Sequence, residues 1–338
     1  MRSSLFLQSL IPVIAMFAFA CIASVDGQEV NRQFEFEYRA QLKNVEGKAA
    51  RVWIPVAQSD AFQKVEIVEK RFSSEPKLTQ DAKYGNQMYY LEFDPKAGDA
   101  EVFVKYRVTR NEVKGLNEKA AGSDSRNADK FLAANQLVPV EGKSVELFDA
   151  YAKAQNWDSE NTTKEFGQNL YHFVREHMAY DKSKPGYGNG NVAWACDSKT
   201  GNCTDFHSLF ISVARNRKVP AKFEIGFPLP KERGTGEIGG YHCWARFFDK
   251  QSGWIPVDIS EADKHPEMSK YFFGNLTENR VHFTTGRDIS LVPKQQAPPL
   301  NYFIYPHVEV DGEVYPTKNI EMKFAYRDIE TEDKEDSR

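Results

Sequence analysis

Apolar and polar residues alternate with a period of two in five short stretches of the N-terminal third of the chain. These stretches are 34–40, 50–56, 64–68, 88–93 and 102–108. Because successive side chains of a strand point to opposite faces, such alternation is typical of strands that bury one face. Short strands at this spacing predict an antiparallel β-sandwich over residues 28–113.

The pattern changes in the middle of the chain. Residues 114–136 are polar and rich in Ala, Ser, Asn and Lys, a composition typical of a linker. Apolar residues then recur at helical spacing over 145–154 and 166–177, and short alternating stretches follow. We therefore expect a second, α+β domain at 137–326, followed by an acidic, disordered tail at 327–338.

One predicted helix also places a thiol. The apolar residues that follow Cys203 are spaced as one buried helix face: Phe206, Leu209, Phe210, Val213 and Ala214. Asn202 is a favourable N-cap, and Asp205 three residues later completes a capping box. Cys203 is therefore expected at the first helical position.

The start of a helix suits a reactive thiol. Unpaired backbone N–H groups and the helix dipole stabilise an anion there, and a free Cys, with a pKa of about 8.5, needs such help to ionise at neutral pH. The same N–H groups suit the oxyanion of a tetrahedral intermediate. The alternative interpretation of Cys203 is a structural thiol buried in the core.

An imidazole and a carboxylate fall on two further predicted strands. Residues 242–248 alternate, 249–253 form a turn and 254–258 read as a second strand, so a hairpin is predicted. His242 begins one strand and Asp258 ends its partner, where a carboxylate can hold the imidazole in one tautomer. With Cys203, these residue types are the nucleophile, base and orienting group of a cysteine acyl-transfer enzyme.

The residues around these three side chains resemble the transglutaminase-like superfamily, and more narrowly its exported bacterial members. The motifs are Gly-Asn-Cys-Thr-Asp-Phe at 201–206, Val-Pro-Ala at 219–221, Tyr-His-Cys-Trp-Ala at 241–245 and Gly-Trp-Ile-Pro-Val-Asp at 253–258. Lys218 and Lys222 replace the usual Gly and Arg around the second motif. The resemblance implies a papain-like catalytic domain after the β-sandwich and a Cys-His-Asp triad, which maps onto Cys203, His242 and Asp258.

Charge and motif content exclude several other functions. The chain has 338 residues and a formal net charge of −4, with no basic cluster interleaved with aromatic residues, which argues against nucleic-acid binding. A phosphate-cradling glycine motif is also missing from the sequence, so a nucleotide-dependent mechanism has no support. We expect neither a cofactor nor a catalytic metal.

The N-terminus predicts export. Arg2 precedes an apolar run from about residue 5 to residue 23, and polar residues follow at 26–28, which is typical of a secretory signal peptide, here 1–27. The run is nearly long enough to remain as an uncleaved membrane anchor. A lipoprotein site at Cys21 is a weaker alternative because the preceding residues lack the expected Leu. We expect a periplasmic or extracellular protein that contacts the membrane only if this segment stays uncleaved.

Export bears on the remaining cysteines, which are Cys196, Cys203 and Cys243. An odd number in an oxidising compartment leaves one thiol free, as a nucleophile requires, and a Cys196–Cys243 bridge remains open. A competing interpretation is a zinc site made of Cys203, His207, His242 and Cys243. The ligand types suit zinc, but their spacing matches no compact zinc motif.

The predicted activity is hydrolysis of a peptide, protein or amide substrate through a thioester on Cys203. Two alternatives stay open: transamidation of protein glutamine, and a catalytically silent module that binds a peptide or glycan. The resemblance does not decide, because relatives include cross-linkers, peptidases and deglycosylating amidases. Aromatic residues lining an acceptor tunnel would favour amine transfer, but four nearby aromatic residues are each expected in the core: Trp194, Tyr241, Trp244 and Trp254.

Overall fold

The computed structural model describes residues 30–329, except residues 44, 48, 95–99, 117–124 and 158–161. The predicted signal peptide at 1–27 and residues 330–338 of the predicted acidic tail lie outside the described residues. Among the described residues, no helix is both long enough and apolar enough to cross a membrane.

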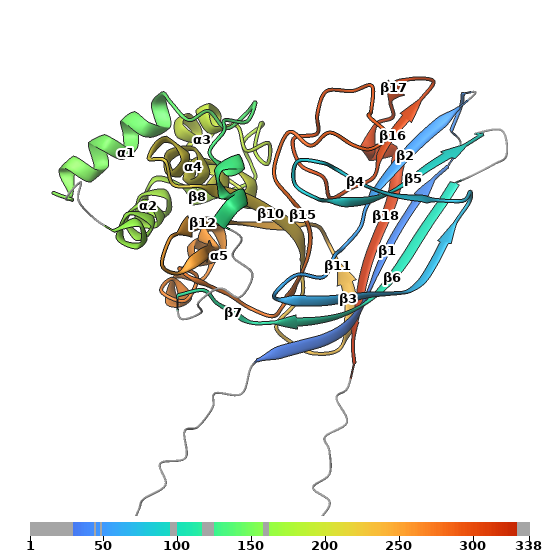
Figure 1. The fold of residues 1–338 in the computed structure, drawn as a ribbon, viewed down its shortest axis with the longest axis horizontal. Coiled ribbons are helices and arrows are strands. Elements are labelled where there is room, and N and C mark those ends of the chain that lie inside the picture. Colours follow the sequence, from blue (N-terminus) through green and yellow to red (C-terminus); the bar gives the residue numbers. More distant parts are fainter. Residues whose placement is uncertain are drawn as a thin grey trace, which may run out of the picture.

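Two five-stranded antiparallel sheets make up one side of the molecule (Figure 1). The first has the order β11 (Thr235–Ile238), β18 (Ile320–Asp328), β1 (Asn31–Leu42), β6 (Ala100–Asn111) and β3 (Gln63–Phe72). The second has the order β17 (Glu313–Val314), β16 (His307–Val310), β2 (Ala50–Pro55), β5 (Gln87–Phe93) and β4 (Lys77–Gln80). The predicted stretches at 34–40, 50–56, 64–68, 88–93 and 102–108 correspond to β1, β2, β3, β5 and β6, and the strand predictions are confirmed.

The chain returns to these sheets at its C-terminal end. β18 pairs with β1 from Phe34↔Asp328 to Leu42↔Ile320, and β16 pairs with β2. This differs from the expected boundaries, which placed everything from 137 to 326 in the second domain and began a disordered tail at 327, whereas β18 runs to Asp328. The physical reason is that β1 and β2 each have an edge left to pair, and β18 alternates buried and exposed residues as a matching strand does.

The helices and a smaller sheet lie on the other side of the molecule (Figure 1). This four-stranded sheet has the order β13 (Gly253–Val257), β12 (His242–Asp249), β10 (Ala221–Pro228) and β15 (Arg280–Thr285). The α-helices are α1 (Lys143–Ala154), α2 (Thr163–His177), α3 (Val192–Ser198), α4 (Cys203–Asn216) and α5 (Ile259–Lys264). The predicted helices at 145–154 and 166–177 are confirmed as α1 and α2. Shorter elements complete the fold: β7 (Val113–Lys114), η2 (Ser125–Phe131), β8 (Ala179–Tyr180), β9 (Thr200–Gly201), η3 (Pro266–Met268), β14 (Asn275–Leu276) and η4 (Thr317–Asn319).

The described part of the predicted linker at 114–136 is packed rather than free. Phe131 is buried and its ring contacts those of Tyr84 and Trp254. Asn135 is also buried and accepts a 2.6 Å hydrogen bond from Arg215 of α4. These residues therefore belong to the folded core, although the composition of the segment is that of a linker.

The two sides of the molecule share one hydrophobic core. Phe227 of β10 contacts Phe36 of β1, with ring centroids 5.1 Å apart, and Phe324 of β18, at 4.4 Å. Phe324 also contacts Tyr38 of β1 at 5.0 Å. The sandwich and the four-stranded sheet are thus held together by aromatic packing between β1, β10 and β18.

This packing predicts that Phe324→Ala destabilises the whole molecule. Phe324 is 5% exposed, and truncating a buried Phe costs about 3–5 kcal/mol because it removes apolar contacts and leaves a cavity. Urea unfolding, followed by fluorescence and circular dichroism, measures the change. Val314→Ala is the control: Val314 is 53% exposed in the same C-terminal part, so its loss should cost no more than about 0.5 kcal/mol. Equal effects of the two substitutions would contradict this account of the core.

Candidate active site

Cys203 is the first residue of α4, as the sequence predicts. Asn202 caps the helix by accepting a 2.8 Å hydrogen bond from Thr204 N–H, and Asp205 accepts one of 2.9 Å from Asn202 N–H. A Cβ on Gly201 would lie 2.5 Å from the Asp205 carboxylate, so this tight entry needs a glycine. The capping box fixes the direction of the first turn: the Asp205 and Phe206 N–H groups donate to the Asn202 carbonyl oxygen at 3.1 Å and 3.2 Å.

His242 and Asp258 meet at the end of the predicted hairpin. His242 opens β12, and Asp258 directly follows β13, which pairs with β12 in antiparallel register. His242 Nε2 and Asp258 Oδ2 are 2.8 Å apart, and Asp258 has no exposed surface. Because Nε2 is bonded to the carboxylate, Nδ1 is the ring nitrogen left for Cys203. The structure thus brings together all three side chains that the sequence singled out.

Arg280 is a further member of the site. It opens β15, is 3% exposed and donates a 2.9 Å hydrogen bond from Nη1 to Asp258 Oδ2. Burial alone would raise the pKa of Asp258, but the positive charges of His242 and Arg280 hold it well below its usual range. Sequence reasoning missed Arg280 because a single arginine at the start of a strand carries no motif.

The positive charge of His242 and the negative charge of Cys203 stabilise each other. Burial lowers the pKa of His242, but the Asp258 carboxylate and the Cys203 sulfur outweigh this and raise it to about 10. Burial raises the pKa of the Cys203 thiol, yet hydrogen bonds from Cys243 and His242 hold it well below its ordinary value. The favoured state at neutral pH is therefore a thiolate–imidazolium ion pair.

His207 lies beside the ion pair but is itself neutral. Its Nδ1 is 2.7 Å from the Cys203 carbonyl oxygen, and its Nε2 accepts a 3.0 Å hydrogen bond from Ile259 N–H. Because Nε2 accepts, Nδ1 is the nitrogen that carries the proton. Burial lowers the pKa of His207 to about 4. With both nitrogens engaged, His207 has no lone pair for the zinc site considered from the sequence, and it instead links the nucleophile helix to the segment after Asp258.

The described residues do include one cluster of metal-ligand types, formed by His242, Asp258 and Glu261. Their ligand atoms lie within 4.8 Å of one another. Asp258 Oδ2 is already bonded to both His242 and Arg280, and the arginine occupies the place at which a cation would balance the carboxylate. This geometry fits an internally paired carboxylate better than a cation site.

Polar contacts hold a glycine-rich loop against the start of α4. The buried Asp205 carboxylate accepts hydrogen bonds from Gly188 N–H at 2.7 Å and from Gly190 N–H at 2.8 Å. Tyr241, just before His242, has its hydroxyl 3.0 Å from Thr204 Oγ1 and accepts from Asn202 Nδ2 at 3.2 Å. Asp205 therefore has a second role besides the cap, since it also orders the loop beside Cys203.

The three described cysteines are all free and buried. Burial raises the pKa of Cys196, in α3, to about 11, so this thiol is protonated at neutral pH. Cys243 is hydrogen-bonded to Cys203 and not joined to Cys196, so the Cys196–Cys243 bridge that the sequence left open is not formed here.

The ion pair predicts how the rate of Cys203 alkylation depends on pH. As pH falls through the lowered pKa of Cys203, the thiolate is protonated and its reaction with iodoacetamide slows; above that value the reaction is fast even where ordinary thiols are protonated. Asp258→Asn removes the charge that raises the pKa of His242, so the pKa of Cys203 rises and its acid limb moves to higher pH. On the acid limb, where the pH lies below the pKa of Cys203, each unit of rise lowers the rate at a given pH about tenfold.

Site-specific alkylation measured by mass spectrometry from pH 5 to pH 9 provides the test. Glu261→Gln is the matched control, because Glu261 lies 3.9 Å from His242 Nε2, is more exposed than Asp258 and should shift the profile less. An Asp258→Asn profile identical to that of the unmodified protein, or equal shifts in both variants, would contradict the ion pair.

Comparisons with known proteins agree with the motifs. Residues 150–259 match the model of the transglutaminase-like superfamily. An uncharacterized protein of Haemophilus influenzae is 26% identical over 304 residues, which cover 78% of this chain and 81% of that protein. YebA of Bacillus subtilis is 19% identical over 199 residues, which cover 54% of this chain and 27% of YebA.

A solved structure extends the likeness to the fold of most of the chain. The crystal structure of a candidate cysteine protease from Cytophaga hutchinsonii has a TM-score of 0.55 and 12% sequence identity, and covers 90% of this chain and 94% of that one. At this identity the likeness shows the fold alone. The segment matched by the family model contains Cys203, His242 and Asp258. Residues 150–259, which hold the three candidate catalytic side chains, are therefore similar to the transglutaminase-like superfamily.

Proposed function

We propose that this protein is an exported cysteine hydrolase that cleaves peptide or amide bonds with Cys203, His242 and Asp258. The observation that carries the proposal is the buried bond between His242 and Asp258, at 2.8 Å, beside a thiol whose pKa is held low. A buried charge pair of this kind is characteristic of functional sites, because burying charge without a role is costly.

In the acylation step, the Cys203 thiolate attacks the carbonyl carbon of the substrate amide. The carbonyl becomes an oxyanion beside the N-terminus of α4, where the helix dipole and the Cys203 N–H stabilise negative charge. His242, as imidazolium, gives its proton to the leaving amine when the C–N bond breaks. The product is a thioester on Cys203 and a neutral imidazole that remains bonded to Asp258.

In the deacylation step, His242 takes a proton from water, and the resulting hydroxide attacks the thioester carbonyl. The C–S bond breaks, the acid product leaves and the thiolate–imidazolium pair is restored. Asp258 stays ionised throughout because Arg280 and His242 both lower its pKa. The residues of the chain thus supply both proton transfers without a metal or cofactor.

Water is the proposed acceptor, rather than an amine, because of where the aromatic residues lie. Trp244 has no exposed surface and donates its Nε1–H to Glu224 at 2.6 Å, so its indole belongs to the core. Trp254 packs between Phe131 and Phe248. Two of the four aromatic residues considered for an acceptor tunnel are therefore engaged elsewhere, which supports hydrolysis. A third, Tyr241, lies beside Thr204 at the start of α4.

Export to the periplasm or the extracellular space is part of the proposal and rests on the predicted signal peptide at 1–27. The proposed substrates are peptides, proteins or other amides in that compartment. Proteolytic mapping of the mature N-terminus after expression in a bacterial host tests this part separately from the chemistry.

The activity is tested with a glutamine-containing peptide library offered to purified, reduced protein with and without a primary amine. We expect cleaved or deamidated products that form at the same rate in both conditions, and no product with Cys203→Ala. Amine incorporation that outpaces hydrolysis would overturn the choice of water and establish transamidation. Absence of both products would favour the silent binding module instead.

A further inference from the structure

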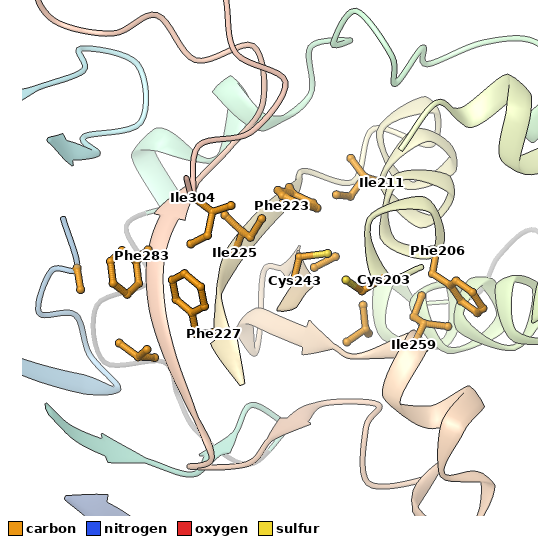
Figure 2. Close-up of a cluster of buried hydrophobic side chains, with 14 of the residues drawn as sticks. Cys203, Phe206, Ile211, Phe223, Ile225, Phe227, Cys243, Ile259, Phe283 and Ile304 are labelled. Carbon is orange, nitrogen blue, oxygen red and sulfur yellow. The ribbon is translucent and has the colours of Figure 1, made fainter. Parts of the chain in front are cut away.

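A second thiol faces the proposed nucleophile. Cys243 follows His242 on β12, and Figure 2 shows the sulfur atoms of Cys243 and Cys203 turned toward each other between β12 and α4. Cys243 Sγ also lies 3.8 Å from Thr204 Oγ1 and 3.8 Å from His207 Nδ1, both on the first turns of α4. Cys243 is therefore seated against the part of the helix that begins with Cys203.

The two thiols are in different states. Cys243 has no exposed surface, and its S–H donates to the Cys203 sulfur. Burial is the main cause that raises the pKa of Cys243 well above its ordinary value, and the nearby Cys203 sulfur raises it further. Cys243 therefore remains a thiol while Cys203 is ionised. A small oxidant that reaches this pair therefore reacts first with Cys203, because the thiolate is the nucleophilic form.

We propose that Cys243 is a resolving thiol, which condenses with oxidised Cys203 to form a reversible Cys203–Cys243 disulfide. The proposal takes the Cys203 thiolate from the proposed function, but it does not require that the protein hydrolyse any substrate. Its oxidant is a peroxide, the class of small two-electron oxidant that a thiolate attacks.

The first step forms a sulfenic acid. The Cys203 thiolate attacks one oxygen of hydrogen peroxide, an S–O bond forms and the O–O bond breaks. The sulfur loses two electrons and the peroxide gains them. The departing hydroxide takes the proton of the His242 imidazolium and becomes water, so Cys203–SOH is left beside a neutral imidazole.

The second step forms the disulfide. The Cys243 sulfur attacks the Cys203 sulfur, an S–S bond forms and the S–O bond breaks. The hydroxyl group leaves with the Cys243 proton as a second water. The balance is two thiols and one hydrogen peroxide to one disulfide and two waters. A thiol reductant returns the disulfide to two thiols by exchange and is itself oxidised to a disulfide, whereas further oxidation of an unprotected sulfenic acid to sulfinic acid is not reversed by thiols.

Cys196 provides the natural control for this pairing. It is buried in α3, and the carbonyl oxygen of the same residue accepts a 3.3 Å hydrogen bond from His177 Nε2. Its pKa is raised by burial to about 11, so it reacts slowly with peroxide. Removing Cys196 should therefore leave the oxidation of Cys203 unchanged.

The experiment treats the reduced full-length protein with stoichiometric hydrogen peroxide and maps its cysteines by peptide mass spectrometry. We expect a Cys203–Cys243 cross-linked peptide, and return of Cys203 alkylation after dithiothreitol. Cys243→Ala and Cys243→Ser should instead give a dimedone-trapped sulfenic acid on Cys203 that proceeds to sulfinic acid, with alkylation permanently lost. Cys196→Ala should behave as the unmodified protein. The serine variant preserves size and polarity if the alanine variant fails to fold.

Two results would overturn the proposal. One is sulfinic acid formation on Cys203 in the unmodified protein at the same rate as in the folded Cys243→Ser variant. The other is a disulfide that uses Cys196 or joins two molecules. Because every readout is the state of a thiol, failure of the peptide library to be cleaved would reject the proposed hydrolysis without affecting this result.

Discussion

The site depends on a carboxylate that has been removed completely from water. Asp258 has no exposed surface, and such a buried charge persists only when cations and hydrogen bonds replace its hydration. Arg280 supplies one permanent cation at 2.9 Å, and His242 is held as the second. The imidazolium in turn favours the thiolate of Cys203. The reactivity of the thiol thus follows from burying Asp258, and the orientation of His242 is a consequence of the same requirement.

That requirement ties the site to the β-sandwich. Arg280 opens β15, and further along that strand Phe283 lies 5.6 Å from Phe36 of β1, between ring centroids. The neighbouring strand β10 contacts both β1 and β18 through Phe227. The sandwich therefore supports the strand that carries the counter-charge of Asp258. The aromatic contacts thus give the sandwich a packing role beside the site.

Local sequence signals predicted the local structure well, but they did not predict how distant segments pair. The cap at Asn202, the helix after Cys203 and the hairpin that brings His242 to Asp258 each depend on residues close together in the chain. The pairing of β18 with β1 joins segments nearly the whole chain apart, and only the alternation of Ile320, Met322, Phe324 and Tyr326 hinted at a strand. Arg280 was missed for the same reason, because its partner is defined by the fold and not by spacing.

Helix α4 shows why an amphipathic pattern is an incomplete guide here. Its apolar stripe predicted one buried face, yet the structure buries every residue from Cys203 to Arg215. The polar residues of the helix are bonded to protein instead of water: His207 accepts from Ile259 N–H, Ser212 lies 2.9 Å from Ser144, and Arg215 donates to Asn135. Buried polar groups must be paired to avoid a desolvation penalty, and each such pair fixes the helix against a different segment. The polar residues of α4 therefore hold the nucleophile helix in place, whereas hydrophobicity alone would predict that they face solvent.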